Sequence, residues 1–326
     1  MKVDIFAICN KDYIDITKVA LCSFYEHYEY PITIFLTDDS SEIFKEIFKD
    51  YKKVTFKDFG KNTKTFKFIE ENYEKFDNDF SFCFDKEKMI NVFIANEITD
   101  YISNTTDADI IQRLDLDVLF FKGELEKSWE NFYNSGKTLG GSQEDYNYFK
   151  LTRRRKYGKK NYIDCEVYLN AGNFMYRVDR MIKNQYDTAI NLIKELGFEK
   201  FHFFDQDTVN KMYSDKDKYA VNKDGWIIQP ENLSNHYQKI KDKNIINIHY
   251  VGTNKPFILP SESYDHRDIK SHLYFSFQKY LSYAIKTKCS EDFINKIKEN
   301  IKIQANMKFL SFHPTEMKAI IEIGKL

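Results

Sequence analysis

Residues 3–8 (VDIFAI) and 31–36 (PITIFL) are predicted strands, because both are short apolar runs of residues that favour extended structure. A helical pattern lies between them at residues 14–28, and a second helical pattern at 42–49 and a third apolar run at 54–59 follow. The first sixty residues therefore predict a parallel sheet with crossover helices. Ligands bind such sheets beyond the carboxyl ends of the strands, so the loop at residues 9–13 is a candidate ligand loop.

The rest of the chain continues this α/β pattern. We expect helices at 86–102, 125–133, 178–196 and 205–212, and strands at 108–114, 118–121, 138–141, 165–175 and 245–249. From residue 268 onward the sequence is predicted to be helical. These patterns predict a catalytic domain at residues 1–260 and a helical C-terminal extension at 261–326.

Composition excludes several classes of protein. Hydrophobic residues make up 42% of the 326 residues, which is enough for a sizeable core and argues against disorder. The 11 glycines and 5 prolines are too few for long flexible linkers. The net charge of −1 argues against a general nucleic-acid binder, which carries a basic excess.

The cysteines and the N-terminus indicate an intracellular protein. The 5 cysteines are odd in number and contain no Cys-x-x-Cys pair, which argues against a disulfide framework or a zinc-thiolate site. Residues 1–10 lack the basic and long apolar regions of a signal peptide, and no apolar run has the length of a membrane span. We therefore expect a soluble, cytoplasmic protein.

Two carboxylates, Asp115 and Asp117, lie between two apolar runs. Carboxylates in such a position cost free energy unless they are exposed or paired with a cation. Their spacing in extended chain points both side chains to one side, and Mg²⁺ and Mn²⁺ prefer oxygen ligands. A strand-end turn with two solvated acids is the alternative interpretation.

Residues 246–257 (INIHYVGTNKPF) contain a second group of candidates. His249, at the end of a predicted strand, can be a metal ligand. Gly252 allows close approach of the backbone, and Lys255 can meet a phosphate as a point charge. The alternatives are a core histidine and an ordinary surface turn.

Two further segments carry polar residues in apolar surroundings. Asp205, Gln206 and Asp207 begin a predicted helix, where the acids also suit capping, although capping does not explain the glutamine. Asn170 lies within an apolar run, which indicates a ligand contact, close backbone packing or a β-bulge.

Taken together, these four segments resemble glycosyltransferase family 8, which includes bacterial lipopolysaccharide galactosyl- and glucosyltransferases and the glycogenins. The resemblance runs from about residue 3 to residue 257 and does not cover the C-terminal fifth of the chain. The segments that carry it are 113–120 (RLDLDVLF), 168–172 (YLNAG), 205–210 (DQDTVN) and 248–257 (IHYVGTNKPF).

The resemblance implies the GT-A fold, a Rossmann-like α/β domain with a mixed central sheet. It also implies a nucleotide-sugar donor, usually linked to UDP, a Mn²⁺ or Mg²⁺ ion, and transfer of a hexose to a glycan or glycolipid with retention of anomeric configuration. By motif match the resemblance assigns the following roles: Asp115, Asp117 and His249 as metal ligands, Lys255 and the backbone of Gly252 as diphosphate contacts, Asn170, Asp205 and Gln206 as donor-sugar contacts, with Gln206 nearest the reacting carbon.

The resemblance also places nucleotide contacts at the end of the first strand and in the loop after it. They are Ala7, Ile8, Asn10, Asp12 and Tyr13, with Asp115 as a further contact and Tyr13 as the residue that stacks on the base. Here the loop departs from the family pattern, because its acid is displaced and it is one residue longer. Asn173 also departs, since relatives have an aliphatic residue after Asn-Ala-Gly.

The basic run at residues 153–160 (RRRKYGKK) lies where relatives carry an acceptor-side loop. We expect it to contact an anionic acceptor, such as a phosphorylated glycolipid, or the acidic inner face of a membrane as a peripheral contact. A solvated loop is the alternative.

Three other functions stay open at this point. An inverting GT-A transferase would need a carboxylate base near the acceptor, and Asp205 or Asp207 could serve. A sugar-phosphate nucleotidyltransferase is disfavoured because no Gly-rich basic loop follows the first strand. The third is a non-catalytic homologue that binds nucleotides or glycans, against which the complete set of presumed metal and sugar contacts argues.

Overall fold

In the computed structural model, residues 1–60, 62–76, 86–144, 163–228, 244–251, 255–259 and 273–306 are described. Their contacts divide the chain into two compact units, each made of three segments. Unit 1 contains residues 1–11, 31–115 and 129–221, and unit 2 contains residues 12–30, 116–128 and 222–326. Both units therefore include early and late parts of the sequence.

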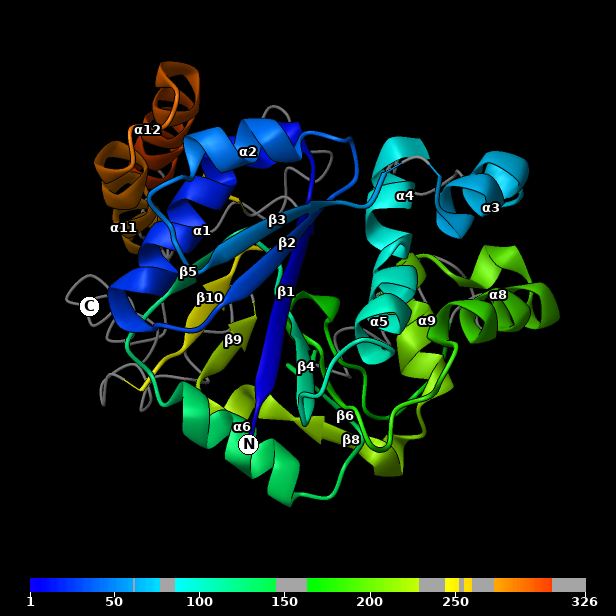
Figure 1. The fold of residues 1–326 in the computed structure, drawn as a ribbon. Helices are drawn as coiled ribbons and strands as arrows, with labels where there is room; N and C mark the ends of the chain where they lie inside the picture. The colour runs from blue at the N-terminus through cyan, green and yellow to red at the C-terminus, as the bar shows by residue number, and fades with distance from the viewer. Residues whose placement is uncertain are drawn as a thin grey trace. The chain divides into compact units, whose positions relative to one another are not determined.

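Unit 1 is built on a seven-stranded sheet with the strand order β3-β2-β1-β4-β7-β6-β8 (Figure 1). The four strands from β3 to β4 are parallel, β7 is antiparallel to both β4 and β6, and β8 is parallel to β6. The bounds are β1 Val3–Cys9, β2 Ile32–Leu36, β3 Val54–Asp58, β4 Ile110–Arg113, β6 Leu139–Gly141, β7 Met175–Arg177 and β8 Lys218–Ala220. The expected mixed central sheet is confirmed.

The central strands of this sheet are apolar because both of their faces are covered. Ile5 of β1 pairs with Ile32 of β2, Ala7 pairs with Ile34, and all four side chains are buried. The helices of unit 1 are α2 Ser41–Ile47, α3 Lys64–Asn72, α4 Lys86–Phe93, α5 Ala95–Ser103, α8 Gln185–Leu196 and α9 Phe204–Met212, and α6 Leu125–Asn134 begins in unit 2. Helices α4, α5, α8 and α9 lie together beside the sheet (Figure 1).

Most expected elements are confirmed, and the differences have local causes. The strand expected at 165–175 is wrong: the chain there forms a short 3₁₀ turn at Ala171–Asn173 before β7. The helix expected from residue 178 begins only at Gln185, because Asn184 has a left-handed backbone that interrupts helical geometry. Helix α3 and strands β8 and β9 were not predicted, and the two strands, of three residues each, are too short to show an alternating pattern.

Among the residues described for unit 2 are a three-stranded sheet and the helices α1 (Ile14–His27), α11 (Leu273–Lys286) and α12 (Glu291–Asn306). Strand β10 (Asn247–His249) is central, antiparallel to β5 (Val118–Phe120) and parallel to β9 (Trp226–Ile228). Helices α1, α11 and α12 pack around it through one apolar cluster (Figure 1). The cluster joins Ile248 of β10 to Phe277 and Tyr280 of α11 and to Ile297 of α12.

Helices α11 and α12 confirm a helical C-terminal extension. They pack against each other and, through α11, against α1. The domain boundary expected at residue 260 lies outside the described residues and stays a prediction. Among the described helices, none combines the length and apolar character that a membrane crossing requires.

Candidate active site

The two acidic side chains of the 113–120 segment follow β4 directly. The backbone of Asp115 donates to the carbonyl of Gly172 at 2.8 Å, and the preceding Leu114 donates to the carbonyl of Phe6 at 2.8 Å. The carbonyl of Asp117 accepts a hydrogen bond from the backbone of Tyr250, the residue after β10, at 3.0 Å. Main-chain hydrogen bonds therefore hold the backbone at both acidic residues.

Asp117 and His249, two of the predicted metal ligands, form a group with Lys255, which we call the cation-side group. His249 Nε2 lies 3.1 Å from Asp117 Oδ1, and the Lys255 ammonium forms an ion pair with Asp117 Oδ2. Asp117 and His249 are buried, and Lys255 is half-buried. Burial raises the pKa of Asp117, but the positive charge of Lys255 and the His249 ring outweigh it and hold this pKa well below its usual range. Asp117 is therefore a carboxylate at neutral pH.

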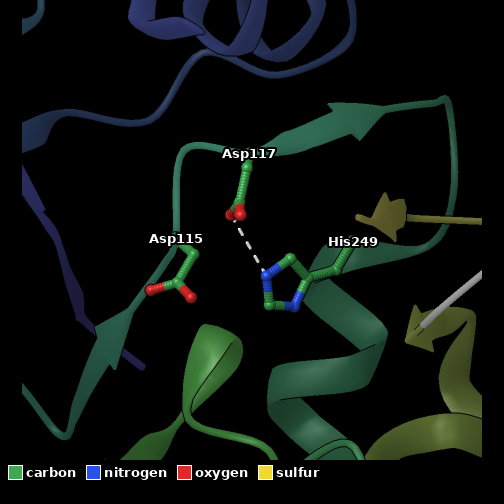
Figure 2. A group of neighbouring side chains, drawn as sticks. All are labelled: Asp115, Asp117 and His249. Carbon is green, nitrogen blue, oxygen red and sulfur yellow. Dashed lines mark hydrogen bonds and ion pairs between the residues drawn. The ribbon is translucent and has the colours of Figure 1, made fainter. Parts of the chain in front are cut away.

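Asp115 completes a possible set of metal ligands with Asp117 and His249. One ligand atom from each residue lies within 4.8 Å of the others, and Figure 2 shows the Asp117 carboxylate directed at the His249 ring. Two carboxylate oxygens and one imidazole nitrogen suit Mg²⁺ or Mn²⁺. The residues present therefore fit the divalent cation that the sequence implied.

Asn170 and Gln206, the predicted donor-sugar contacts, form a second group with Glu144 in unit 1, which we call the sugar-side group. The Asn170 and Gln206 amides each donate to Glu144 Oε1 at 3.0 Å. The Gln206 carbonyl oxygen accepts from the backbone of Ala171 at 2.9 Å, and Asn170 Oδ1 accepts from Gly172 at 2.9 Å. Both amides are thus held in one orientation by a carboxylate and by the 3₁₀ turn.

Asp205 is paired with a residue from β4. Its carboxylate forms a buried ion pair with Arg113, whose guanidinium also lies 3.5 Å from Asp115. Burial lowers the pKa of Arg113, but Asp205 and Asp115 outweigh it and raise this pKa above its usual value. Burial raises the pKa of Asp205, against the opposing effect of Arg113. Arg113 stays charged and links Asp205 to the carboxylate of Asp115.

Asp207 has the capping position that the helical pattern allowed. Its carboxylate accepts from the backbone of Phe203 at 2.8 Å and from the Tyr168 hydroxyl at 2.7 Å. Phe204, which follows Phe203 and begins α9, has a left-handed backbone with φ of 38°. This conformation costs energy for a residue with a bulky side chain. This strained start of α9 orients Asp205 and Gln206.

Two residues of the site were missed by sequence reasoning. Glu144 follows β6, where the sequence appeared irregular, and no pattern distinguished it from other surface acids. Arg113 stands in the 113–120 segment, but its partner Asp205 is ninety-two residues away.

Asn173, which departs from the family pattern, makes two hydrogen bonds to Ser142 through its side-chain amide. The amide oxygen accepts from the Ser142 backbone nitrogen at 3.0 Å, and the amide nitrogen donates to the Ser142 hydroxyl at 2.8 Å. It thereby fixes the β6 end two residues before Glu144.

The residues of the first loop differ in accessibility. Ala7 is fully buried within β1, so only its backbone can contact a ligand, whereas Ile8 is partly exposed. Asn10 is buried, donates to Glu87 at 3.3 Å, and has no partner for its amide oxygen among the described residues. Asp12 is exposed and Tyr13 is half-buried, both in the turn Lys11–Tyr13.

Some predicted site residues fall in parts of the chain that the structure does not describe. They are Gly252 and the basic run at residues 153–160. Their contacts with a diphosphate and with an anionic acceptor or membrane stay predictions.

Comparisons with known proteins gave a family match and similar solved structures. The model of glycosyl transferase family 8 matches residues 4–257. A similar solved structure is the galactosyltransferase LgtC in complex with donor and acceptor sugar analogues, with a TM-score of 0.59, 16% identity, and coverage of 90% of this chain and 99% of that one. Mouse xyloside xylosyltransferase 1 has a TM-score of 0.50 and 15% identity, covering 76% of this chain and 97% of its own. The search of curated proteins gave no match.

The chain belongs to glycosyltransferase family 8, because the family model spans more than half of it and includes all four motif segments. It has the GT-A fold and is a glycosyltransferase that uses a nucleotide-sugar donor.

Proposed function

We propose that this enzyme is a metal-dependent, retaining hexosyltransferase that moves a sugar from UDP to a glycan or glycolipid acceptor. The observation that carries the proposal is the convergence of Asp115, Asp117 and His249, with ligand atoms within 4.8 Å of one another. Departure of a diphosphate is the step that needs charge neutralisation, and this cluster offers the oxygen and nitrogen ligands that a divalent cation takes.

Mn²⁺ or Mg²⁺, when held by Asp115, Asp117 and His249, would neutralise the negative charge that develops on the leaving diphosphate. Lys255 supplies a further positive charge beside Asp117. A lysine ammonium binds phosphate oxygens as a point charge, so Lys255 is the proposed diphosphate contact.

The first loop supports recognition of a nucleotide base. The buried amide oxygen of Asn10 lacks a partner among the residues described, and an unpaired buried acceptor costs free energy. Uracil offers one ring N–H donor, which could satisfy this oxygen. Tyr13 is the proposed stacking partner, and Ile8 and Asp12 lie on either side of Asn10 in the chain.

The sugar-side group is proposed to hold the hexose. The developing positive charge on the anomeric carbon is stabilised by a nearby amide or carboxylate oxygen. Gln206 is the proposed residue nearest that carbon, with Asn170 as a hydroxyl contact and Glu144 orienting both. An active-site glutamine has also been changed to glutamate in LgtC.

Retention is proposed to occur by front-face attack. The acceptor oxygen bonds to the anomeric carbon on the face that the diphosphate leaves, and the acceptor proton passes to the departing phosphate oxygen. The inverting alternative needs a free carboxylate base, but Asp205 is paired with Arg113 and Asp207 accepts two hydrogen bonds. NMR of the first-formed product tests the stereochemistry, and an inverted anomeric centre would contradict the proposal.

The glycan or glycolipid acceptor is supported by the acceptor sugar analogue bound to LgtC. The basic run at residues 153–160 is proposed to favour an anionic acceptor. Neutralising these residues should raise the acceptor KM and weaken binding to anionic vesicles if this part of the proposal holds, and should change neither if the run is a solvated loop.

Thermal unfolding tests the metal and donor parts of the proposal. A ligand that binds only the folded protein raises the unfolding midpoint according to its affinity. We expect UDP to raise the midpoint in Mn²⁺ but not in EDTA, more than GDP, ADP or CDP does. The increase should vanish in Asp117→Ala. No shift with any nucleotide would contradict the proposed donor site.

A further inference from the structure

We propose that Asn300 of α12 is a positioning residue for the diphosphate, acting through the main chain of Lys255. The inference rests on the proposed role of Lys255 as a diphosphate contact. It gives the C-terminal extension, which the family model does not cover, a part in donor binding.

Asn300 is buried, and its amide nitrogen faces three main-chain oxygens of one short segment. The distances are 3.1 Å to the Lys255 carbonyl, 3.2 Å to the Pro256 carbonyl and 2.8 Å to the Ile258 carbonyl. Because carbonyl oxygens only accept hydrogen bonds, the side-chain atom that faces all three must be the amide nitrogen, and this fixes the orientation of the Asn300 amide. Its own oxygen has no partner within the described ranges. The polar interactions described for this side chain are therefore all directed at the Lys255 segment.

The segment depends on this donor for its shape. The Ile258 backbone closes a turn onto the Lys255 carbonyl at 3.2 Å, while Pro256 has no N–H to donate. Three carbonyl oxygens that converge repel one another unless a donor lies between them. Removal of the Asn300 amide would thus take this donor away from all three carbonyls and allow the turn to open.

Aromatic packing from the same two helices adds to this restraint. Phe257 stacks on Phe293 of α12 with ring centroids 5.3 Å apart, and lies 6.0 Å from Tyr280 of α11. Tyr280 also meets Tyr250 edge-on at 5.6 Å, next to His249. The helical extension therefore packs on the residues that follow both His249 and Lys255.

The connection matters because a lysine ammonium stands at the end of a long, flexible stem. Its reach toward Asp117 is defined only if the backbone of Lys255 is fixed. Asn300 is the described side chain that supplies this anchor by hydrogen bonding. Its loss should misplace the ammonium without removing the charge.

The test compares Asn300→Ala with Ile297→Ala, a control on the same helix that shortens a fully buried side chain of the α11–α12 packing. Calorimetry with UDP and Mn²⁺ should show about tenfold weaker binding for Asn300→Ala and wild-type binding for Ile297→Ala. The UDP affinity of Asn300→Ser, whose hydroxyl keeps one donor, should lie between those of the wild type and Asn300→Ala. This variant carries the test if Asn300→Ala does not fold. Equal weakening in Asn300→Ala and Ile297→Ala would overturn the inference.

A double-mutant cycle separates this inference from the proposed function. If Asn300 acts through Lys255, Asn300→Ala should weaken UDP binding in the wild type and have no further effect in a Lys255→Ala background. If Lys255→Ala weakens binding and Asn300→Ala does not, or if the two effects add, the positioning role is wrong. If Lys255→Ala leaves binding unchanged, the proposed diphosphate contact itself is wrong.

Discussion

The cation-side and sugar-side groups of this enzyme are organised on opposite electrostatic principles. In the first, one buried carboxylate, Asp117, faces a lysine ammonium and an imidazole. In the second, one carboxylate, Glu144, holds two neutral amides by single hydrogen bonds. The first arrangement is suited to managing charge, and the second to fixing the direction of neutral groups. Changes in the two groups should therefore have different effects.

The groups also differ in how the chain assembles them. Asp117 and His249 of the cation-side group lie at the ends of neighbouring strands, because β10 pairs with β5 and brings His249 opposite Val118. The sugar-side residues are held by α9, where Asn210 accepts from the Leu169 backbone and donates to its carbonyl, and Gln206 accepts from Ala171. Strand register sets one group, and helix-to-loop hydrogen bonds set the other.

The largest expected effect is that of Asp117→Asn. The change keeps the side-chain volume but removes the charge that faces Lys255 and His249, and we expect activity to fall at least about a thousandfold. Loss of a buried partner should also lower the free energy of unfolding by about 3 kcal/mol. Activity assays and denaturant unfolding measure the two effects. Asp107→Asn, an exposed acid paired with Lys2, is the control and should change neither.

Lys255→Met should weaken binding of UDP by about a hundredfold at constant Mn²⁺, because it removes one full charge from the diphosphate site. Lys286→Met is a matched control, since Lys286 is an exposed lysine paired with Glu26 on α1. The dissociation constants come from calorimetry. A loss of affinity equal to that of the control would remove Lys255 from the binding site.

Gln206→Ala should separate the two groups. We expect kcat to fall about a hundredfold while the dissociation constant of UDP stays near that of the wild type, because UDP lacks the sugar that Gln206 is proposed to contact. Glu144→Ala should lower kcat by about tenfold, since Asn170 and Gln206 would lose their common acceptor. If either variant loses UDP affinity and kcat equally, the division between the groups does not hold.

The smallest effect lies outside both groups, at the contact between α1 and the start of α12. Asp15 accepts from the Ser290 hydroxyl at 2.5 Å and its backbone at 3.1 Å, and it pairs with Lys18 at 3.1 Å. Burial raises the pKa of Asp15, but these donors outweigh it and lower that pKa overall. The carboxylate therefore stabilises the fold above its unfolded pKa, and this stabilisation is lost as the pH falls through the folded value.

Asp15→Asn should accordingly lower the free energy of unfolding by about 1 kcal/mol at pH 7. The difference from the wild type should begin to shrink below about pH 4, the unfolded pKa of an aspartate, and should be lost once the pH has fallen through the lower pKa of folded Asp15. Denaturant unfolding at several pH values measures it. A difference that does not change with pH would mean that the charge of Asp15 plays no part.

The fold and the cation-side group were largely predictable from sequence. Apolar strands with helices between them predict the parallel part of the sheet, and the family resemblance grouped Asp115, Asp117 and His249 as metal ligands. The sugar-side group was only half predictable, because the partners of Gln206 and Asn170 come from a segment with no periodic pattern. Glu144 and Arg113 became visible only when the structure brought residues far apart in sequence into hydrogen-bond contact. Hydrogen bonding at the start of the helix accounts for Asp207. The role of Gln206 became visible only from its hydrogen bonds with the Ala171 backbone and with Glu144.

The most direct test of the central claim is titration calorimetry of UDP with the wild type, Asp117→Asn and Gln206→Ala, each in Mn²⁺ and in EDTA. The account predicts that Mn²⁺ strengthens binding to the wild type and to Gln206→Ala alike, and has no effect on Asp117→Asn. Binding of UDP to the wild type that is equally strong in EDTA, or an Asp117→Asn variant that keeps its dependence on Mn²⁺, would contradict it.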